Sequence, residues 1–167
     1  MIRVGYLAPL PGWEGLHQQA MQGLAQNAAM KLVGPPLQSP INETEYRRVF
    51  EAMAQAHVDA VFVSDYGENF THRSVIAQLA AEHRIPTIHP YGGYVEVGGL
   101  MEYATDLGAL WREIADLTIR ILSGQSPLEL PFRQPSKFSL RLNAKAANAL
   151  GLTIPPTLLA RADEVIE

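Results

Sequence analysis

The sequence predicts an α/β fold built on a doubly wound parallel sheet. Short β-branched, apolar runs alternate four times with segments of helical periodicity, and the connections between them are short. Parallel strands joined by right-handed crossovers are what such an alternation requires, with helices on both faces of the sheet. At 167 residues the chain fits one domain with a substantial core. We therefore expect a single Rossmann-like domain.

The first predicted elements are a buried strand over residues 2–8 and a helix over residues 14–31. The strand is a short apolar run that ends at Pro9. Residues 32–37 predict a weaker strand, which we place at a sheet edge because they contain two prolines and proline cannot donate to a β-ladder. The apolar positions of the helix are Leu16, Ala20, Leu24 and Ala28.

The next helix, over residues 42–56, has the clearest start signal. Asn42 is a suitable N-cap, and Glu45 follows it at the spacing of a capping box. The apolar face of this helix consists of Tyr46, Val49, Phe50 and Met53. After it come a predicted strand, helix and strand over residues 58–63, 71–83 and 85–88.

The last third of the chain contains the strongest amphipathic pattern. The stripe at helical spacing consists of Leu107, Leu110, Trp111, Ile114, Leu117, Thr118, Ile121 and Leu122. The simplest expectation is that this helix packs on the chain's own sheet, since burying the stripe is worth several kcal/mol at about 25 cal/mol per Å². Beyond a proline-rich stretch we predict a strand over 138–142, a short helix capped by Asn143 and a closing helix over 157–167.

Composition excludes several classes of protein. The net charge is −4 and no run of Lys or Arg is present, which argues against nucleic-acid binding. The absence of cysteine excludes disulfides, thiolate metal sites and a cysteine nucleophile. No stretch reaches the roughly 18 apolar residues of a membrane helix, so no membrane insertion is expected. The first residues do not form a signal peptide, so we expect either a cytoplasmic protein or an export signal upstream of this sequence.

Candidate ligand-binding residues follow the predicted strands. In an open parallel sheet, ligands bind at the carboxyl ends of the strands. Aromatic and polar residues gather there in the sequence: Trp13, Ser64, Asp65, Tyr66, Tyr91 and Tyr94. Aromatic walls with a few polar groups are typical of a small-molecule pocket. The alternative is that these aromatic side chains only cover the edge of the sheet.

Enzyme and metal-site patterns fit poorly. Gly12-Trp-Glu-Gly15 after the first strand is neither a dinucleotide fingerprint nor a P-loop, and Ser64 lacks the GxSxG elbow. The five histidines show no ligand spacing, so we expect no metal and no cofactor. We therefore predict a protein that is not an enzyme; a small α/β enzyme using Ser64, Asp65 or His72 is the least favoured alternative.

Several short segments carry a family pattern. They are Gly98-Gly99-Leu-Met, Ile121-Leu122-x-Gly124, Leu130-Pro131, Asn143-x-x-x-Ala147 and Gly151-Leu-x-Ile-Pro155. With these segments, nearly the whole chain resembles the substrate-binding proteins of ABC transporters, most closely the group for tryptophan or tyrosine uptake. The resemblance implies one lobe of a type I periplasmic-binding-protein fold, present as the C-terminal half.

The resemblance also implies a division of the chain. Residues 1–97 correspond to the core of the second lobe, 98–125 to a crossing segment with its helix, and 126–167 to a returning tail. The main segment of the first lobe is missing, so the amphipathic helix lacks its usual neighbours. We therefore expect a homodimer formed through Leu107, Trp111 and Ile114.

The expected function follows from the resemblance and the predicted pocket. The chain is expected to be the solute-binding component of an ABC uptake transporter, with a small organic molecule as ligand, an aromatic amino acid being one candidate. The resemblance places Asp106 near the hinge and adds it to the ligand-binding set. It also implies an ABC permease as partner and a periplasmic location. The alternative is a stand-alone small-molecule sensor or regulatory domain of the same fold.

Overall fold

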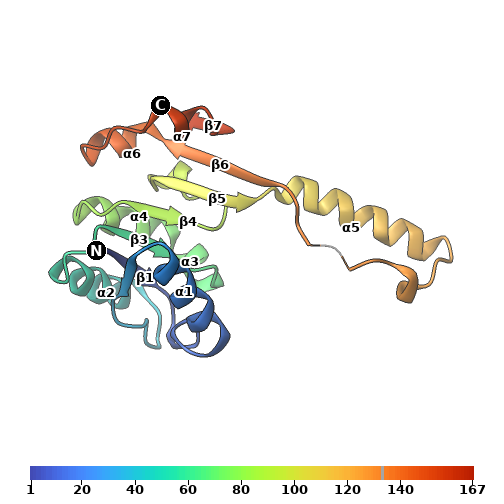
Figure 1. The fold of residues 1–167 in the computed structure, drawn as a ribbon, viewed down its shortest axis with the longest axis horizontal. Coiled ribbons are helices and arrows are strands. Elements are labelled where there is room, and N and C mark those ends of the chain that lie inside the picture. Colours follow the sequence, from blue (N-terminus) through green and yellow to red (C-terminus); the bar gives the residue numbers. More distant parts are fainter. Residues whose placement is uncertain (133) are drawn as a thin grey trace.

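A single sheet forms the body of the molecule, and one long helix projects from it, in the computed structural model of the chain (Figure 1). The structure describes residues 1–132 and 134–167, with the backbone alone described for residues 15–18. The strands are β1 (Ile2–Leu7), β2 (Met30–Val33), β3 (Ala60–Val63), β4 (Thr87–His89), β5 (Met101–Thr105), β6 (Phe138–Asn143) and β7 (Glu164–Ile166). The α-helices are α1 (Gly15–Asn27), α2 (Glu43–Gln55), α3 (Gly67–Thr71), α4 (Arg73–Glu82), α5 (Leu107–Leu122), α6 (Ala144–Ala149) and α7 (Pro156–Leu159).

The strands lie in the order β2-β1-β3-β4-β5-β6-β7. All neighbours from β2 to β5 pair in parallel, and the register aligns Val4 with Ala60 and Ile88 with Met101. The predicted doubly wound α/β fold is therefore confirmed. β2 lies at the predicted edge of the sheet, although it spans Met30–Val33 and ends before the two prolines. β6 pairs antiparallel with β5, which the sequence pattern did not indicate.

Helices α2 and α4 cover one face of the sheet and form the main core with it. Along β3 this face holds Val61 and Val63, which are fully buried. The start of α2 is fixed by its N-cap, since the Asn42 side chain accepts a hydrogen bond from the Glu45 backbone N–H at 3.1 Å. The core cluster includes Leu7, Tyr46, Val49, Phe50, Met53, Val61, Val63, Ile76, Leu79 and Tyr94.

Helix α1 lies on the opposite face and covers it incompletely. The β3 residues on this face, Ala60 and Phe62, are only half-buried. The apolar positions predicted for this helix are exposed wherever their side chains are described. Leu24 is 61% exposed, and Ala25 is the buried position instead, because the helix approaches the sheet through a small residue and leaves its larger apolar ones at the side. Leu16 lies outside the described side chains.

A buried carboxylate joins β5 to the segment before it. The side chain of Glu102 is fully buried and accepts hydrogen bonds from the backbone N–H groups of Tyr94 and Val95. Arg141 on β6 donates to the same carboxylate at 3.0 Å, which supplies the opposite charge that burial requires. Gly99 packs so closely here that a Cβ would lie 2.8 Å from the Tyr94 carbonyl oxygen. Close packing therefore explains the glycine at position 99, and the positive φ of 101° explains the glycine at position 98.

The end of the chain differs from the predicted closing helix. Only α7 is helical there, and β7 follows it and pairs in parallel with β6. The prediction of a helix over 157–167 was therefore wrong, because pairing with a distant strand decided the conformation of the last residues. The predicted helix capped by Asn143 is confirmed as α6, with the Asn143 side chain accepting from Ala146 N–H at 2.8 Å.

Helix α5 stands clear of the sheet (Figure 1). Its predicted extent is confirmed, but the expectation that it packs on the chain's own sheet was wrong. Ala109 is the buried residue described for this helix, while Trp111 is 65% and Leu122 81% exposed. The helix leaves the body where β5 ends and returns through residues 126–137 to β6.

Candidate ligand-binding site

Three parallel strands end side by side at the carboxyl edge of the sheet. The register pairs Leu7 of β1 with Val63 of β3, and β4 pairs with β3 on its other side. The Asn69 side chain ties two of these ends together, because its Nδ2 donates to the carbonyl oxygens of Leu7 and Ser64 at 3.2 and 3.1 Å. The loops that carry the predicted ligand-binding residues therefore start from a fixed frame.

Tyr6, the penultimate residue of β1, is where several of these loops meet. Its ring lies 5.4 Å from that of Trp13, centroid to centroid, at an angle of 56°. Gly12 separates the two aromatic loops, since a Cβ there would lie 3.1 Å from Tyr66 and 3.4 Å from the Tyr6 hydroxyl oxygen. Burial, with the negative charge of Asp65 second, raises the pKa of Tyr6 to about 12. The phenol is therefore neutral and remains a hydrogen-bond donor.

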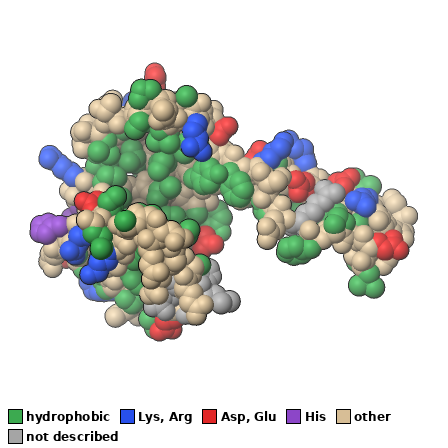
Figure 2. All heavy atoms as spheres, viewed as in Figure 1, with side chains coloured by type: hydrophobic (Ala, Val, Ile, Leu, Met, Phe, Trp, Pro, Cys, Tyr) green, Lys and Arg blue, Asp and Glu red, His purple; other side chains and the backbone are tan. Residues whose placement is uncertain are grey.

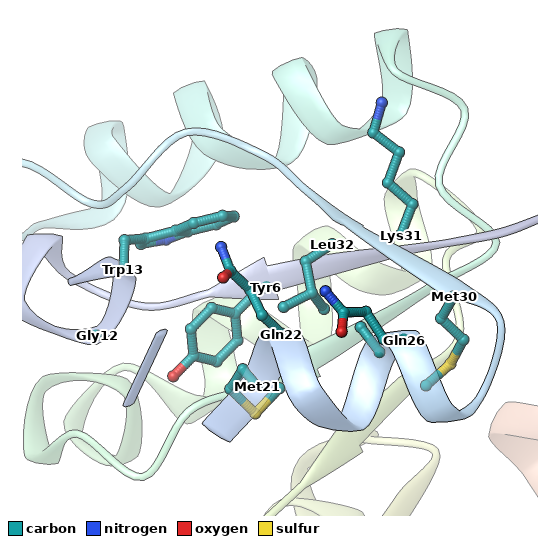
Figure 3. A pocket seen from close by; sticks show the side chains of 10 residues that line it. Tyr6, Gly12, Trp13, Met21, Gln22, Gln26, Met30, Lys31 and Leu32 are labelled. Atoms are coloured by element: carbon teal, nitrogen blue, oxygen red, sulfur yellow. The ribbon is translucent and has the colours of Figure 1, made fainter. Parts of the chain in front are cut away.

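Trp13 and Tyr6 line a hollow of about 410 Å³ beside α1 (Figure 3). Figure 3 shows both rings bordering this space with the amide of Gln22 between them, whereas the Lys31 side chain points away. The indole nitrogen of Trp13 is buried and has no hydrogen-bond partner among the residues that the structure describes. A buried donor without a partner is costly, so a ligand acceptor or a water is expected opposite it. The hollow is lined by Tyr6, Gly12, Trp13, Met21, Gln22, Ala25, Gln26, Met30, Lys31 and Leu32.

Ser64 and Asp65 lie next to each other but in different environments. Ser64 is buried, and its hydroxyl accepts a hydrogen bond from Asn69 Nδ2 at 2.9 Å. Asn69 is in turn held by the Tyr46 hydroxyl, which donates to Asn69 Oδ1 at 2.9 Å. Asp65 is exposed and faces the Tyr6 side of the edge. Ser64 therefore belongs to the frame, and Asp65 is available to a ligand.

The two tyrosines after β4 also differ in exposure, since Tyr91 lies at the surface and Tyr94 is buried. Tyr91 is 36% exposed and meets Phe70 edge-to-face, with ring centroids 6.1 Å apart. Arg73 lies over the Phe70 ring at 4.7 Å, which places a cation beside this aromatic pair. Tyr94 is fully buried and stacks on His89 at 4.0 Å. It supports the loop from inside, whereas Tyr91 lies at its surface.

Asp106 occupies the start of α5. Its carboxylate accepts a hydrogen bond from the Ala109 backbone N–H at 2.9 Å, which makes it the N-cap of that helix. The structure thus brings Trp13, Asp65 and Tyr66 together around Tyr6, and it places Tyr91 with Phe70 and Asp106 at the base of α5.

Sequence reasoning missed three residues of this edge: Tyr6, Phe70 and Arg73. Tyr6 was hidden inside an apolar strand, although its alternation with Leu7 places it on the α1 face. Phe70 lies in α3 and Arg73 begins α4, and Arg73 Nη1 donates a hydrogen bond to the Phe70 carbonyl oxygen at 3.1 Å across the break between the two helices. Among the described residues, no group of three or more His, Cys, Asp or Glu is arranged to hold a metal ion. Within the same part of the chain, the helices are all too short or too polar to cross a bilayer.

The family model for ABC transporter substrate binding proteins matches residues 19–166. This chain belongs to that family. Its members bind solutes and are not enzymes, and they are typically periplasmic or extracellular. The search of curated proteins found no match.

Solved structures of similar fold support the assignment of the fold. A conserved domain protein from Vibrio cholerae O1 biovar El Tor is 22% identical, with a TM-score of 0.80 over 98% of this chain and 54% of its own. An ABC domain from Streptococcus pneumoniae in complex with L-Trp is 22% identical, with a TM-score of 0.78 over 99% of this chain and 56% of its own. A ligand-free, open substrate-binding protein with adhesive properties from Clostridium difficile is 18% identical, with a TM-score of 0.73 over 99% and 54%. The chain spans about half the length of each.

Proposed function

We propose that this chain is a solute-binding lobe of an ABC uptake system and that its solute enters the hollow between Trp13 and Tyr6. The observation that carries the proposal is the buried indole nitrogen of Trp13 beside this hollow, which has no hydrogen-bond partner among the described residues, in a chain of a solute-binding family. Aromatic walls with a few oriented polar groups are the usual lining of a small-molecule site.

The lining favours a planar solute that also carries a hydrogen-bond acceptor. Two aromatic rings offer stacking surfaces, and the Trp13 indole, the Tyr6 phenol and the amides of Gln22 and Gln26 offer donors. An aromatic amino acid meets both requirements, because its ring can stack while its carboxylate accepts. The complex of a similar fold with L-Trp makes this solute the first to test.

The other residues of the edge have different parts in this proposal. Asp65 and Tyr66, beside Tyr6, are placed to meet the ammonium group of the solute, and Tyr91 with Arg73 to meet groups that extend along the edge. Asp106 lies at the base of α5, where its carboxylate orders the start of that helix. Ser64 and Tyr94 act from inside by fixing the loops.

The partners of the chain follow from the same proposal. Closure of two lobes on a solute normally supplies much of the affinity, and the chain spans about half of its structural neighbours. We therefore expect weaker solute binding than in a two-lobed relative. An ABC permease is the expected recipient, on the outer side of the membrane. A second copy is the proposed partner of α5, through Leu107, Trp111 and Ile114, which are all exposed.

The proposed site can be tested by NMR, because the chain contains only two tryptophans and each gives one indole N–H signal. In a ¹⁵N-labelled Trp111→Phe protein, Trp13 is the only source of an indole N–H signal. Titration with unlabelled L-tryptophan, L-tyrosine, aliphatic amino acids and nucleosides should move this signal downfield for the solute that accepts its hydrogen bond. The matched control is Trp13→Phe, in which the exposed Trp111 should not respond. A Trp13 signal that none of the solutes moves would contradict the proposal.

A further inference from the structure

Two apolar surfaces of this chain have no partner within the described residues: one is a hollow and the other is the face of a projecting helix. One is a hollow on the α1 side of the sheet, about 430 Å³ in volume, which we call the open face. The other is the apolar stripe of α5. Both lie on one polypeptide, so a single kind of contact between copies can cover both.

The open face has a sheet floor and a helical wall. Its floor is formed by Val4, Phe62 and Ile88 from three adjacent strands, all of them half-buried. Leu24 and Ala28 of α1, both exposed, form the wall. Figure 2 shows hydrophobic side chains gathered across the middle of this side of the body. This surface is unusually apolar for one that faces water.

The apolar face continues beyond the hollow along β5 and β6. Tyr103 is 53% exposed and stacks on Phe138 of the neighbouring strand at 5.5 Å, with 15° between the rings. Leu152 and Pro155 line a second hollow with Met101 and Leu142, so the last residues of the chain border the open face on its far side. Neighbouring strands lie about 4.8 Å apart. A gap two to three strands wide therefore accepts one helix of about 10 Å diameter.

Helix α5 is a suitable occupant of such a gap. Five large apolar side chains of its stripe are exposed: Leu107, Trp111, Ile114, Ile121 and Leu122. Arg112, Glu113, Asp116 and Arg120 lie away from the stripe, so the helix can lay its apolar side down while its charges stay in water. Because α5 stands clear of its own body (Figure 1), the stripe is presented to another molecule.

We propose that α5 of one copy lies in the open face of a second copy, and that the second copy returns the same contact. This names the receiving surface of the homodimer proposed above and rests on that part of the proposed function. Two identical contacts related by a two-fold axis close the assembly, as an isologous interface requires. The exchange leaves neither apolar surface in water.

The area of this contact suits a stable dimer. Each of the five exposed side chains of the stripe offers roughly 60–120 Å² when covered, given 1.5–3 kcal/mol per side chain at about 25 cal/mol per Å². One helix thus contributes about 300–600 Å² from these side chains, and the reciprocal contact doubles it. With the areas of the receiving surfaces, the total reaches the range of a standard interface of roughly 1,600 Å².

The chain contains no cysteine, so inserted thiols give a direct test. Leu24→Cys marks the open face and Ile114→Cys marks the stripe; both positions are exposed, which protects the fold. Equal amounts of the two full-length variants, one isotopically labelled, are mixed and oxidised, and the mixed disulfide is measured by mass spectrometry. We expect it to form at least about tenfold faster than with Arg112→Cys, an exposed control on the polar side of α5.

The possible results distinguish the proposed receiving surface from the existence of a homodimer. Suppose that the chain sediments as a dimer and that Ile114→Cys forms disulfides with other Ile114→Cys chains but not with Leu24→Cys chains. This result would show that α5 mediates the dimer but that the open face does not receive it. A chain that is monomeric at millimolar concentration overturns both. As a second readout, Leu24→Lys should raise the dimer dissociation constant about tenfold, while Gln19→Lys, at an exposed position of the same helix that lines neither hollow, should not. Solute binding at Trp13 is measured separately and is decided by neither result.

Discussion

At the residue scale, the loop after β4 is held by a buried histidine that stays neutral in the folded protein down to low pH. His89 is fully buried, stacks on Tyr94 at 4.0 Å, and places Nε2 2.8 Å from the Thr87 hydroxyl oxygen. Burial lowers the pKa of His89 to about 3. This side chain makes the stability of the ligand-binding edge depend on pH.

The sign of this dependence follows from the two pKa values. In the unfolded chain histidine has a pKa of about 6.5, so between pH 6.5 and 3 the unfolded state binds a proton that the folded state does not. The free energy of unfolding should therefore fall below pH 6.5, by about 2 kcal/mol at pH 5. His89→Asn should lack this part of the slope in urea denaturation, whereas His83→Asn, at a half-exposed position, should keep it. Identical slopes for the parent and His89→Asn would contradict the burial argument.

Local signals also explain which site residues sequence reasoning reached. Trp13, Asp65 and Tyr66 follow strands, and the rule for parallel sheets places strand ends at one edge. Tyr94 satisfies the same rule but is buried. The loop at this point is held by Glu102 on the next strand, whose carboxylate accepts a hydrogen bond from the Tyr94 backbone N–H. That contact joins residues of different elements, and no spacing in the sequence encodes it.

At the scale of elements, α2 and α5 form a contrast. Both were predicted from their own periodicity, α2 also from its capping residue, and both have the predicted ends within a residue or two. For α2 the tertiary partner is the sheet of the same chain, whereas α5 has most of its surface in water. Helical periodicity thus predicts that a face must be covered, but it does not identify what covers it. The last residues show the converse, since β7 exists only because β6 lies beside it.

Amide exchange should distinguish these two helices. A helix of 16 residues without tertiary packing is marginal in water, whereas α2 opens only with the core. In dilute solution we expect amides of α5 to exchange at least about 100-fold faster than those of α2. Protection of α5 should rise with protein concentration as the stripe is covered, while that of α2 should not change. Equal protection of the two helices at the lowest concentration, measured by mass spectrometry, would contradict this account of α5.

At the scale of the whole molecule, α5 and the segment that returns from it form an insertion in a β-hairpin. Thr105 at the end of β5 pairs with Phe138 at the start of β6, and Asp106 N–H donates to the Lys137 carbonyl oxygen at 2.9 Å. The ladder is therefore already closed where the chain leaves the body. The body consists of the sheet with α1, α2 and α4, and its core contains no residue of α5.

The body should therefore fold without the insertion. Replacing residues 107–136 by Asn-Gly gives a two-residue hairpin turn that matches the twist of antiparallel strands. We expect one cooperative transition and a free energy of unfolding that is unchanged or higher by up to about 2 kcal/mol, because a shorter loop costs less entropy to close. A Gly/Ser loop of the original length is the matched control, since it removes α5 without changing the loop length, and both variants should be monomeric. A loss of stability of several kcal/mol in both would mean that α5 packs on its own body, and it would remove the reason for seeking its partner in a second copy.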